Sequence, residues 1–154
     1  MIVREMLESD LPTLFEQQRD PEANYMAAFT SRDPSDRDAF MKHWRRVLAD
    51  PTLIKKTIVS DTGIVGSLGV FLWRDKPQVT YWIAKEHWGK GIATAALSEF
   101  LRVFQTRPLY ASAARDNIGS IRVLEKCGFQ IQGYERSFAQ ARGAEIEEVM
   151  LQLG

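Results

Sequence analysis

The chain has 154 residues, 45% hydrophobic and 26% charged, which is the composition of one ordinary globular domain. Its 20 Lys and Arg balance its 20 Asp and Glu, so the zero net charge argues against a dedicated nucleic-acid binder. One cysteine excludes an internal disulfide, two distant histidines give no zinc spacing, and no apolar run suits a secretory signal or a membrane span. We therefore expect a single cytoplasmic domain over residues 1–154, with no metal and with neither nucleic acid nor membrane as a partner.

The N-terminal third is predicted to contain a short strand and two helices. Residues 2–6 alternate weakly between apolar and polar, as a strand does. The segment 20–34 is rich in turn-forming residues and is expected to be a connection. The two helices are placed by their candidate cap residues, which are Ser9 or Asp10 for the first and Ser35 with Asp38, in capping-box spacing, for the second.

The rest of the chain is predicted to begin with three strands and then to alternate. The segments 53–60, 64–73 and 78–84 are strand-like and are joined by short turns, so they should be antiparallel neighbours. A helix, a strand, a helix and two strands should follow, over residues 91–104, 107–114, 117–129, 130–140 and 144–153. This order indicates one α+β domain.

The stretch "HWGKGIATAAL", His87 to Leu97, follows a strand and opens a helix. Gly89 and Gly91 remove the side chains that would keep a ligand from the free N–H groups at the helix start, where the helix dipole favours an anion such as phosphate. The spacing fits neither a Walker A loop nor a Rossmann fingerprint, which needs a third glycine where Thr94 stands. On this stretch alone, a phosphate site and a plain glycine turn explain the pattern equally well.

A second stretch, "NIGSIRVLEKCGF", stands about 25 residues further on. Together the two resemble the GNAT superfamily of acetyl-CoA-dependent N-acetyltransferases, and within it the branch of ribosomal-protein N-terminal acetyltransferases. The family's phosphate loop reads Q/R-x-x-G-x-G/A, and Trp88 stands where the family has glutamine or arginine. The residues that carry the resemblance are Gly91, Ala93, Asn117, Ser120, Glu125, Lys126, Gly128 and Phe129.

The resemblance implies a GNAT-like α+β fold, with a mixed, mostly antiparallel central sheet of about seven strands flanked by about four helices. It implies that the pyrophosphate of acetyl-CoA lies on the amides of the glycine loop. It also implies that the pantetheine arm runs as an added strand between segments 78–84 and 107–114, with an N–H near Ile83 polarising the thioester. The cofactor-binding residues implied in this way are Trp82, Ile83, Ala84, Trp88, Gly89, Lys90, Gly91, Ile92, Ala93, Thr94, Asn117 and Ser120.

The expected catalytic groups depart from the family at one position. Many members have a tyrosine acid where this chain has Leu124, and Ser120 is the substitute implied for protonating the leaving thiolate. For the base that takes the proton of the amine, Glu86 lies near the loop and Tyr81 could hold a water. Glu147 and Glu148 on the last strand point to opposite faces, so one of them is a further candidate. Cys127 lies at a helix C-terminus, where the dipole disfavours thiolate, so an acyl-enzyme is not expected.

The sequence therefore predicts direct transfer of the acetyl group from acetyl-CoA to a primary amine, on a protein N-terminus or a small molecule, within a ternary complex. The alternative is a non-catalytic acyl-CoA-binding or regulatory module that kept the loop and lost the acid. A nucleotide-phosphate binder is a weaker third interpretation. The sequence leaves a homodimer possible and does not identify the amine.

Overall fold

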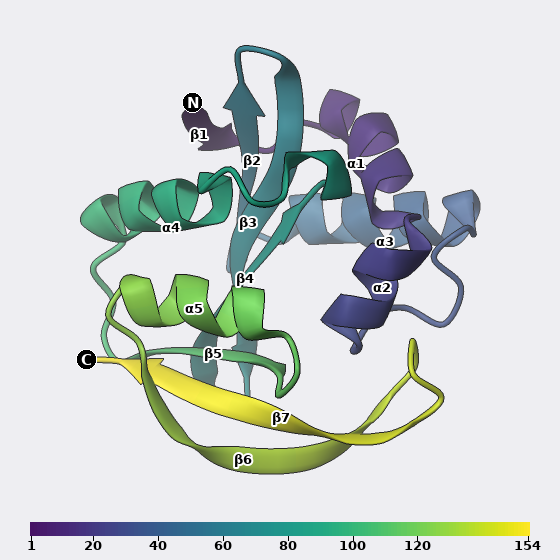
Figure 1. Ribbon diagram of the computed structural model, residues 1–154. Helices are drawn as coiled ribbons and strands as arrows, with labels where there is room; N and C mark the ends of the chain where they lie inside the picture. The colour runs from purple at the N-terminus through teal and green to yellow at the C-terminus, as the bar shows by residue number, and fades with distance from the viewer.

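Seven strands form one sheet in the order β1-β2-β3-β4-β5-β7-β6, with helices on both of its faces (Figure 1). The computed structural model describes residues 1–154. The strands are β1 (Ile2–Glu5), β2 (Ile54–Ser60), β3 (Gly63–Trp73), β4 (Lys76–Ile83), β5 (Leu109–Ala114), β6 (Gln130–Ala139) and β7 (Ala144–Leu153). The helices are α1 (Leu11–Gln18), α2 (Pro21–Ala27), α3 (Arg37–Ala49), α4 (Ile92–Val103) and α5 (Ile118–Lys126), with the short 3-10 turns η1 (Glu8–Asp10) and η2 (Lys85–His87).

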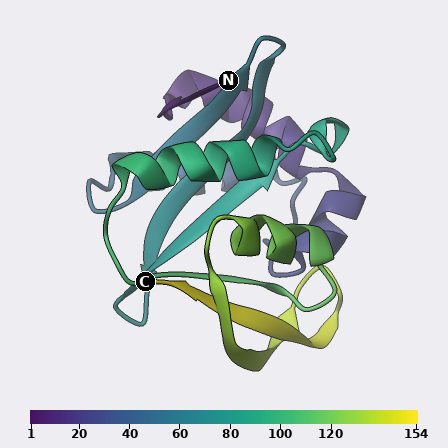
Figure 2. The same cartoon turned by 60° about the vertical axis from the view of Figure 1, so that its left-hand side comes forward.

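The sheet is antiparallel at every pairing except one. The three strands β2, β3 and β4 are antiparallel neighbours, as the sequence predicts. Strands β4 and β5 run parallel and share a single register pair, Gln78 with Tyr110. Beyond that pair they diverge toward their C-terminal ends (Figure 2). The mixed, mostly antiparallel sheet of the expected fold class is thereby confirmed.

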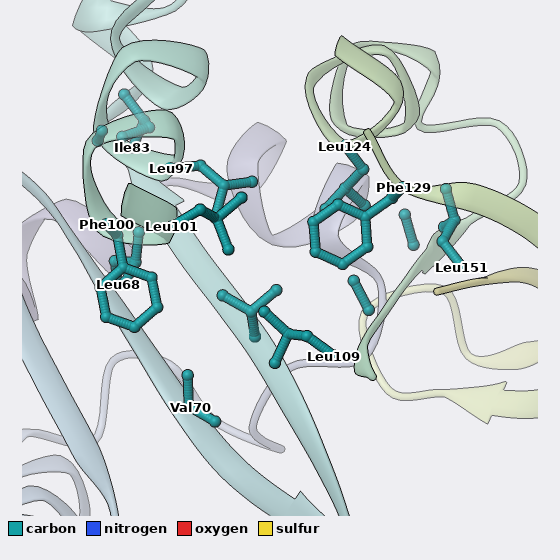
Figure 3. Packing of buried hydrophobic residues seen from close by; sticks show 14 of the residues in the cluster. Leu68, Val70, Ile83, Leu97, Phe100, Leu101, Leu109, Leu124, Phe129 and Leu151 are labelled. Atoms are coloured by element: carbon teal, nitrogen blue, oxygen red, sulfur yellow. The ribbon is translucent and has the colours of Figure 1, made fainter. Parts of the chain in front are cut away.

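The main hydrophobic core lies between the sheet and the two helices α4 and α5. Helix α4 contributes Leu97 and Leu101, which face the side chain of Leu109 on β5, while Leu124 and Phe129 close the core beside α5 (Figure 3). A second cluster, which includes Leu14, Phe15 and Met41, holds α1 and α3 together on the opposite face. No helix is long and apolar enough to cross a membrane.

The connection predicted over residues 20–34 contains a helix, α2, that the sequence analysis missed. The Asp20 carboxylate accepts a hydrogen bond from Ala23 N at 2.8 Å, and Pro21 occupies the first helical position. Both features favour a helix start as well as a turn, because an aspartate cap and a proline at the first position suit either. The buried Asn24 side chain, which donates to Gln18 O and Asp20 O, then fixes the helix.

The predicted helix caps were also wrong in detail. Asp36, rather than Ser35, caps α3 by accepting from Ala39 N at 3.0 Å. Ser35 instead gives its hydroxyl hydrogen to Asp33. Neither Ser9 nor Asp10 caps α1 with a side chain, because the Asp10 carboxylate turns back toward the first strand.

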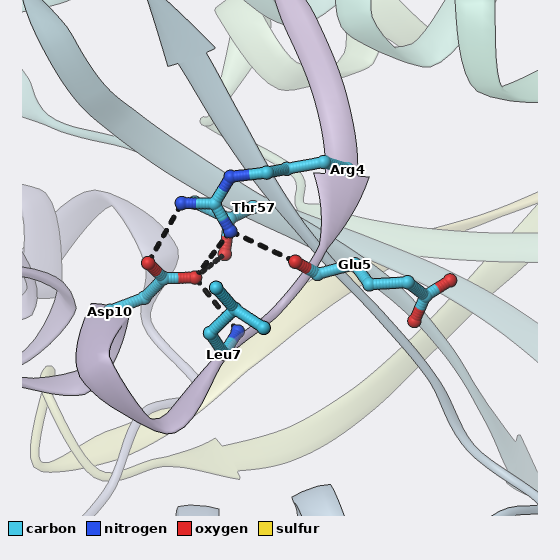
Figure 4. A network of polar contacts seen from close by, with 5 residues as sticks. All are labelled: Arg4, Glu5, Leu7, Asp10 and Thr57. Carbon is cyan, nitrogen blue, oxygen red and sulfur yellow. Dashed lines mark hydrogen bonds and ion pairs between the residues drawn. The ribbon is translucent and has the colours of Figure 1, made fainter.

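Asp10 is the centre of a buried polar network that joins β1, β2 and η1 (Figure 4). Its two oxygens accept from the Arg4 guanidinium at 2.8 Å each, and one of them also accepts from Leu7 N and from the Thr57 hydroxyl. The hydrogen bond from Arg4, helped by those from Leu7 and Thr57, lowers the pKa of Asp10 from 3.8 to about 2, against the effect of burial. The network therefore holds a charged carboxylate inside the fold.

We expect Asp10→Ala to destabilise the protein by about 2 kcal/mol, because it leaves Arg4 and the buried Thr57 hydroxyl without their partner. Because the folded pKa of Asp10 is depressed, its contribution should be present above about pH 4 and lost as the pH falls toward 2. Urea unfolding between pH 2 and pH 7 measures both effects. Glu16→Ala, which removes an exposed ion pair with Arg19, is the control and should change stability by less than about 0.5 kcal/mol.

Candidate functional site

A cleft of about 560 Å³ opens where β4 and β5 diverge, and we call it the loop cleft. Its walls come from α2, the end of β4, the glycine segment and one face of α5. The lining residues are Ala23, Met26, Ala27, Tyr81, Trp82, Ile83, His87, Trp88, Gly89, Gly91, Ile92, Ala93, Thr94, Asn117, Gly119, Ser120, Arg122, Val123 and Lys126.

The N-terminus of α4 opens into this cleft without a side-chain cap. Gly91 stands at the cap position in the left-handed conformation, with φ +75°, and its carbonyl accepts the first helical hydrogen bond from Ala95 N. The N–H groups of Ile92, Ala93 and Thr94 precede that bond and have no partner within the helix. Helices α2, α3 and α5 are each capped by an Asp or Asn side chain. The exposed amides and the helix dipole make the start of α4 suited to an anion.

The loop cleft is lined by basic side chains and by no carboxylate. Arg122 and Lys126 extend from α5, and His87 lies at the end of η2. The sequence analysis did not assign these side chains to the site. Their place in the site could have been predicted from the helical spacing of Gly119, Arg122 and Lys126, which puts the three residues on one face of α5. This lining matches the phosphates of a nucleotide-like ligand.

Ten of the twelve sequence-predicted cofactor residues line the loop cleft, and Ala84 and Lys90 do not. Ala84 N donates to Val65 O at 2.9 Å, and its carbonyl accepts from His87 N at 2.9 Å. Both backbone groups of Ala84 are therefore already used within the fold. Lys90 is exposed beside the loop.

Ile83 is the position on β4 whose backbone faces the loop cleft. Because Ala84 bonds to β3 and backbone direction alternates along a strand, Trp82 also directs its backbone groups to β3, and Ile83 directs its own the other way. The carbonyl of Ile83 accepts from the indole nitrogen Nε1 of Trp88 at 2.8 Å. The remaining backbone donor at this position is the Ile83 N–H.

Tyr81 and Ser120 meet across the cleft, although they are 39 residues apart along the chain. The Tyr81 hydroxyl lies 2.7 Å from Ser120 Oγ and 3.2 Å from the Ser120 carbonyl oxygen. Burial raises the pKa of Tyr81 to about 12, and the hydrogen bond with Ser120 opposes part of that rise. Tyr81 therefore stays protonated, and its single hydrogen can be donated to Ser120 Oγ or to the Ser120 carbonyl oxygen. When it is donated to Ser120 Oγ, the serine hydroxyl is left free to donate into the cleft.

Asn117 caps α5, because its Oδ1 accepts from Ser120 N at 3.3 Å. Its Nδ2 donates to Met26 O at 3.3 Å, which ties α5 to α2 across the cleft. Leu124 is 1% exposed and lies in the main core, away from the cleft. Cys127 lies between α4 and α5, where its sulfur is 3.5 Å from Ser98 Oγ and outside the cleft lining.

The glutamates considered for a base lie outside the cleft. Glu86 is exposed on η2. Glu147 forms ion pairs with Arg115 and Arg136. It shares a face of β7 with Val149 and Leu151 of the main core, so its side chain is on the α5 side of the sheet. Glu148 points to the opposite face, where burial and the nearby Glu135 raise its pKa.

A second cavity of about 880 Å³ lies on the other side of β4, and we call it the α2–α3 cavity. Its walls come from α1, α2, α3, the segment between α2 and α3, and the side chains of Ser67 and Trp82. Trp82 lines both cavities, so the two meet at the C-terminal end of β4. The lining residues are Leu14, Gln18, Asn24, Phe29, Thr30, Ser31, Arg32, Asp33, Pro34, Asp36, Ala39, Phe40, His43, Trp44, Ser67 and Trp82.

Comparison with known proteins matches residues 1–130 to the acetyltransferase (GNAT) domain family. The chain is 29% identical over 126 residues to the "Putative ribosomal N-acetyltransferase YdaF" of Bacillus subtilis, covering 75% of this chain and 69% of that protein. A ribosomal-protein-alanine N-acetyltransferase from Brucella melitensis superposes with a TM-score of 0.77 at 21% identity, over 99% of this chain and 98% of that one. The spermidine N-acetyltransferase of Vibrio cholerae, solved with CoA and spermine, superposes with a TM-score of 0.81 at 15% identity, over 99% and 94%.

Proposed function

Because the chain belongs to the acetyltransferase (GNAT) family, and is thus an acetyl-CoA-dependent N-acetyltransferase, we propose that it transfers acetyl directly to a primary amine within a ternary complex. The observation that carries the proposal is the meeting of two cavities at Trp82. The loop cleft, with its uncapped helix and basic lining, suits acetyl-CoA. The α2–α3 cavity, on the other side of β4, gives the amine its own approach to the same point.

In this proposal the amides of Ile92, Ala93 and Thr94 and the adjacent glycines hold the pyrophosphate, with Arg122 and Lys126 completing the charge. The pantetheine arm lies along β4 in the opening between β4 and β5, in the manner of an added strand. The Ile83 N–H then donates to the thioester oxygen, where negative charge develops as the amine attacks the carbonyl carbon.

The pair Tyr81 and Ser120 serves the leaving group. As the new C–N bond forms and the C–S bond breaks, the sulfur becomes a thiolate, and the Ser120 hydroxyl donates to it. In this proposal Tyr81, whose hydroxyl lies 2.7 Å from Ser120 Oγ, donates to that oxygen and so fixes the direction of the serine hydroxyl. Ser120 thus takes the place of the tyrosine that the family has at position 124, without any need for Leu124 to leave the core.

The test of the proposed function is release of free CoA thiol from acetyl-CoA in the presence of a panel of amines, with mass spectrometry of the products. An N-acetylated amine, formed with one thiol released per acetyl group, supports the proposal. Tight binding of CoA with no turnover of any amine would instead identify the non-catalytic acyl-CoA-binding module.

Gly91→Glu should abolish CoA binding, measured by calorimetry, because it places bulk and negative charge where the pyrophosphate lies. A Cβ at Gly91 meets no protein atom within 4 Å, so the loss would arise from the ligand site and from the positive φ. Gly143→Glu is the matched control, because Gly143 also has a positive φ and open space but lies in the β6–β7 turn. Unchanged CoA affinity in folded Gly91→Glu would refute the loop assignment.

Ser120→Ala should lower kcat by about 100-fold and leave the KM for acetyl-CoA within about threefold, because the serine acts on the departing sulfur. Tyr81→Phe should lower kcat by about tenfold, because it removes only the group that orients the serine. Neither loss should vary between pH 6 and pH 9, since Tyr81 stays protonated throughout that range. Steady-state kinetics of both variants between pH 6 and pH 9 measure kcat and KM. A rise in KM alone would assign Tyr81 and Ser120 to binding.

For the proton that the amine must lose, we propose His43 in preference to Glu86, because His43 lines the α2–α3 cavity and Glu86 lines neither cavity. His43→Gln should lower kcat/KM about tenfold or more at pH 7. The loss should shrink as the pH rises, because more of the amine is then already deprotonated. Glu86→Gln measured over the same pH range decides between the two: a larger, pH-dependent loss in that variant would return the role to Glu86.

A further inference from the structure

Arg142 lies in the turn between β6 and β7, outside both sequence motifs, yet its side chain is only 8% exposed. Its nitrogens Nη1 and Nη2 donate to the Asp116 carboxylate at 2.8 and 2.9 Å, and its Nε donates to Tyr25 O at 2.6 Å. The guanidinium also lies over the Tyr25 ring, 4.0 Å from the ring centroid. In the same turn, Ala141 N donates to Ala28 O at 3.1 Å. One guanidinium thus joins three segments, through a planar fork that a lysine cannot reproduce.

The C-terminal end of α2 is held by donors from outside the helix. A helix leaves its last carbonyl groups without partners of its own. In α2 the carbonyl of Tyr25 accepts from Arg142, and that of Met26 accepts from Asn117 Nδ2 at 3.3 Å. Figure 1 shows the β6–β7 turn directed toward this helix. Because α2 lines both cavities, these hydrogen bonds fix a wall that the loop cleft and the α2–α3 cavity share.

The first turn of α5, which carries Ser120, has little packing of its own. Ile118 and Gly119 are exposed and Ser120 is half-buried, and the buried side chains of the helix begin one residue later. The turn is therefore positioned by hydrogen bonds rather than by packing. Directly before it, Asp116 is held by Arg142, and Asn117 is held by the end of α2.

We propose that Arg142 is a positioning residue for the transfer reaction, which sets the place of the Ser120 hydroxyl through Asp116 and the start of α5. The hydrogen bonds from Arg142 lower the pKa of Asp116, against the effect of burial, so the pair is charged at neutral pH. A misplacement of about 1 Å at a reacting group can cost about 100-fold in rate. This role rests on the proposed function, because it matters only if Ser120 donates to the leaving thiolate.

The test begins with Arg142→Lys, which keeps the charge and loses the fork. With acetyl-CoA and the amine of the panel that is acetylated fastest, kcat should fall about tenfold, and the KM for acetyl-CoA should stay within about threefold. Asp116→Asn, which leaves the contact of Arg142 with Tyr25 in place, should lower kcat by a similar factor. Arg136→Lys is the matched control, because Arg136 lies on the same hairpin in an exposed ion pair with Glu147. The control should leave kcat within about twofold.

A double-mutant cycle separates positioning from a general structural role. Adding Arg142→Lys to Ser120→Ala should lower kcat by less than about twofold further, because the group that Arg142 positions is already absent. Asp116→Asn supports the same cycle if Arg142→Lys does not fold, which thermal unfolding decides.

Hydrogen exchange gives a readout that needs neither substrate. The amides of Ser120 and Ile121 donate to Asn117 and form the first turn of α5. Measured by NMR in the protein alone, both amides should exchange faster in Arg142→Lys than in Arg136→Lys. Equal exchange in the two variants would contradict the proposal, because the start of α5 would then not depend on Arg142.

Three kinetic results would also overturn the proposal. Losses that multiply in the double variant would show that Arg142 acts independently of Ser120. A rise in the KM for acetyl-CoA with kcat unchanged would assign Arg142 to cofactor binding. A kcat within about twofold of the unmutated protein in both single variants would remove the role. These results leave the proposed function standing, whereas absence of turnover by the unmutated protein would refute that function and this role with it.

Discussion

The divergence of β4 from β5 is the constraint on which the loop cleft depends. The two parallel strands share one register pair, Gln78 with Tyr110, and then separate. Beyond that pair the backbone of Ile83 faces a gap where a neighbouring strand would lie. An extended ligand can fill that gap only by pairing with the strand edge. The same divergence brings the start of α4 and the polar face of α5 to the sides of the gap.

Much of this arrangement could be predicted from the sequence because it is local. The glycine loop before α4, the antiparallel strands β2 to β4 and the Asn117 cap each follow from residues close together in the chain. Helix α2 was missed because an aspartate followed by proline favours a turn and a helix start equally, and the tertiary contacts of Asn24 decide between them. The capping role predicted for Asp10 failed for a related reason, since Arg4 and Thr57 compete for its carboxylate.

The contacts within the site could not be predicted, because they join distant segments. The hydrogen bond between Tyr81 and Ser120 spans 39 residues and depends on how α5 packs over the end of β4. The exclusion of Ala84 from the cleft depends on which edge of β4 pairs with β3. The basic face of α5, in contrast, could have been predicted from its helical spacing, because a ligand with phosphates was expected on that side.

The register between β3 and β4 determines which side chains of β4 face each cavity. A one-residue shift would exchange the faces, sending Trp82 toward the core and Tyr81 into the α2–α3 cavity. Gly66 fixes the separation of the two strands at this point, because a Cβ there would lie 2.1 Å from Trp82 O and 3.1 Å from Ile83 Cα. Any larger residue would push the end of β4 away from β3 and so displace Trp82 and Ile83 together. The position of a glycine on the neighbouring strand therefore sets the geometry at which the two cavities meet.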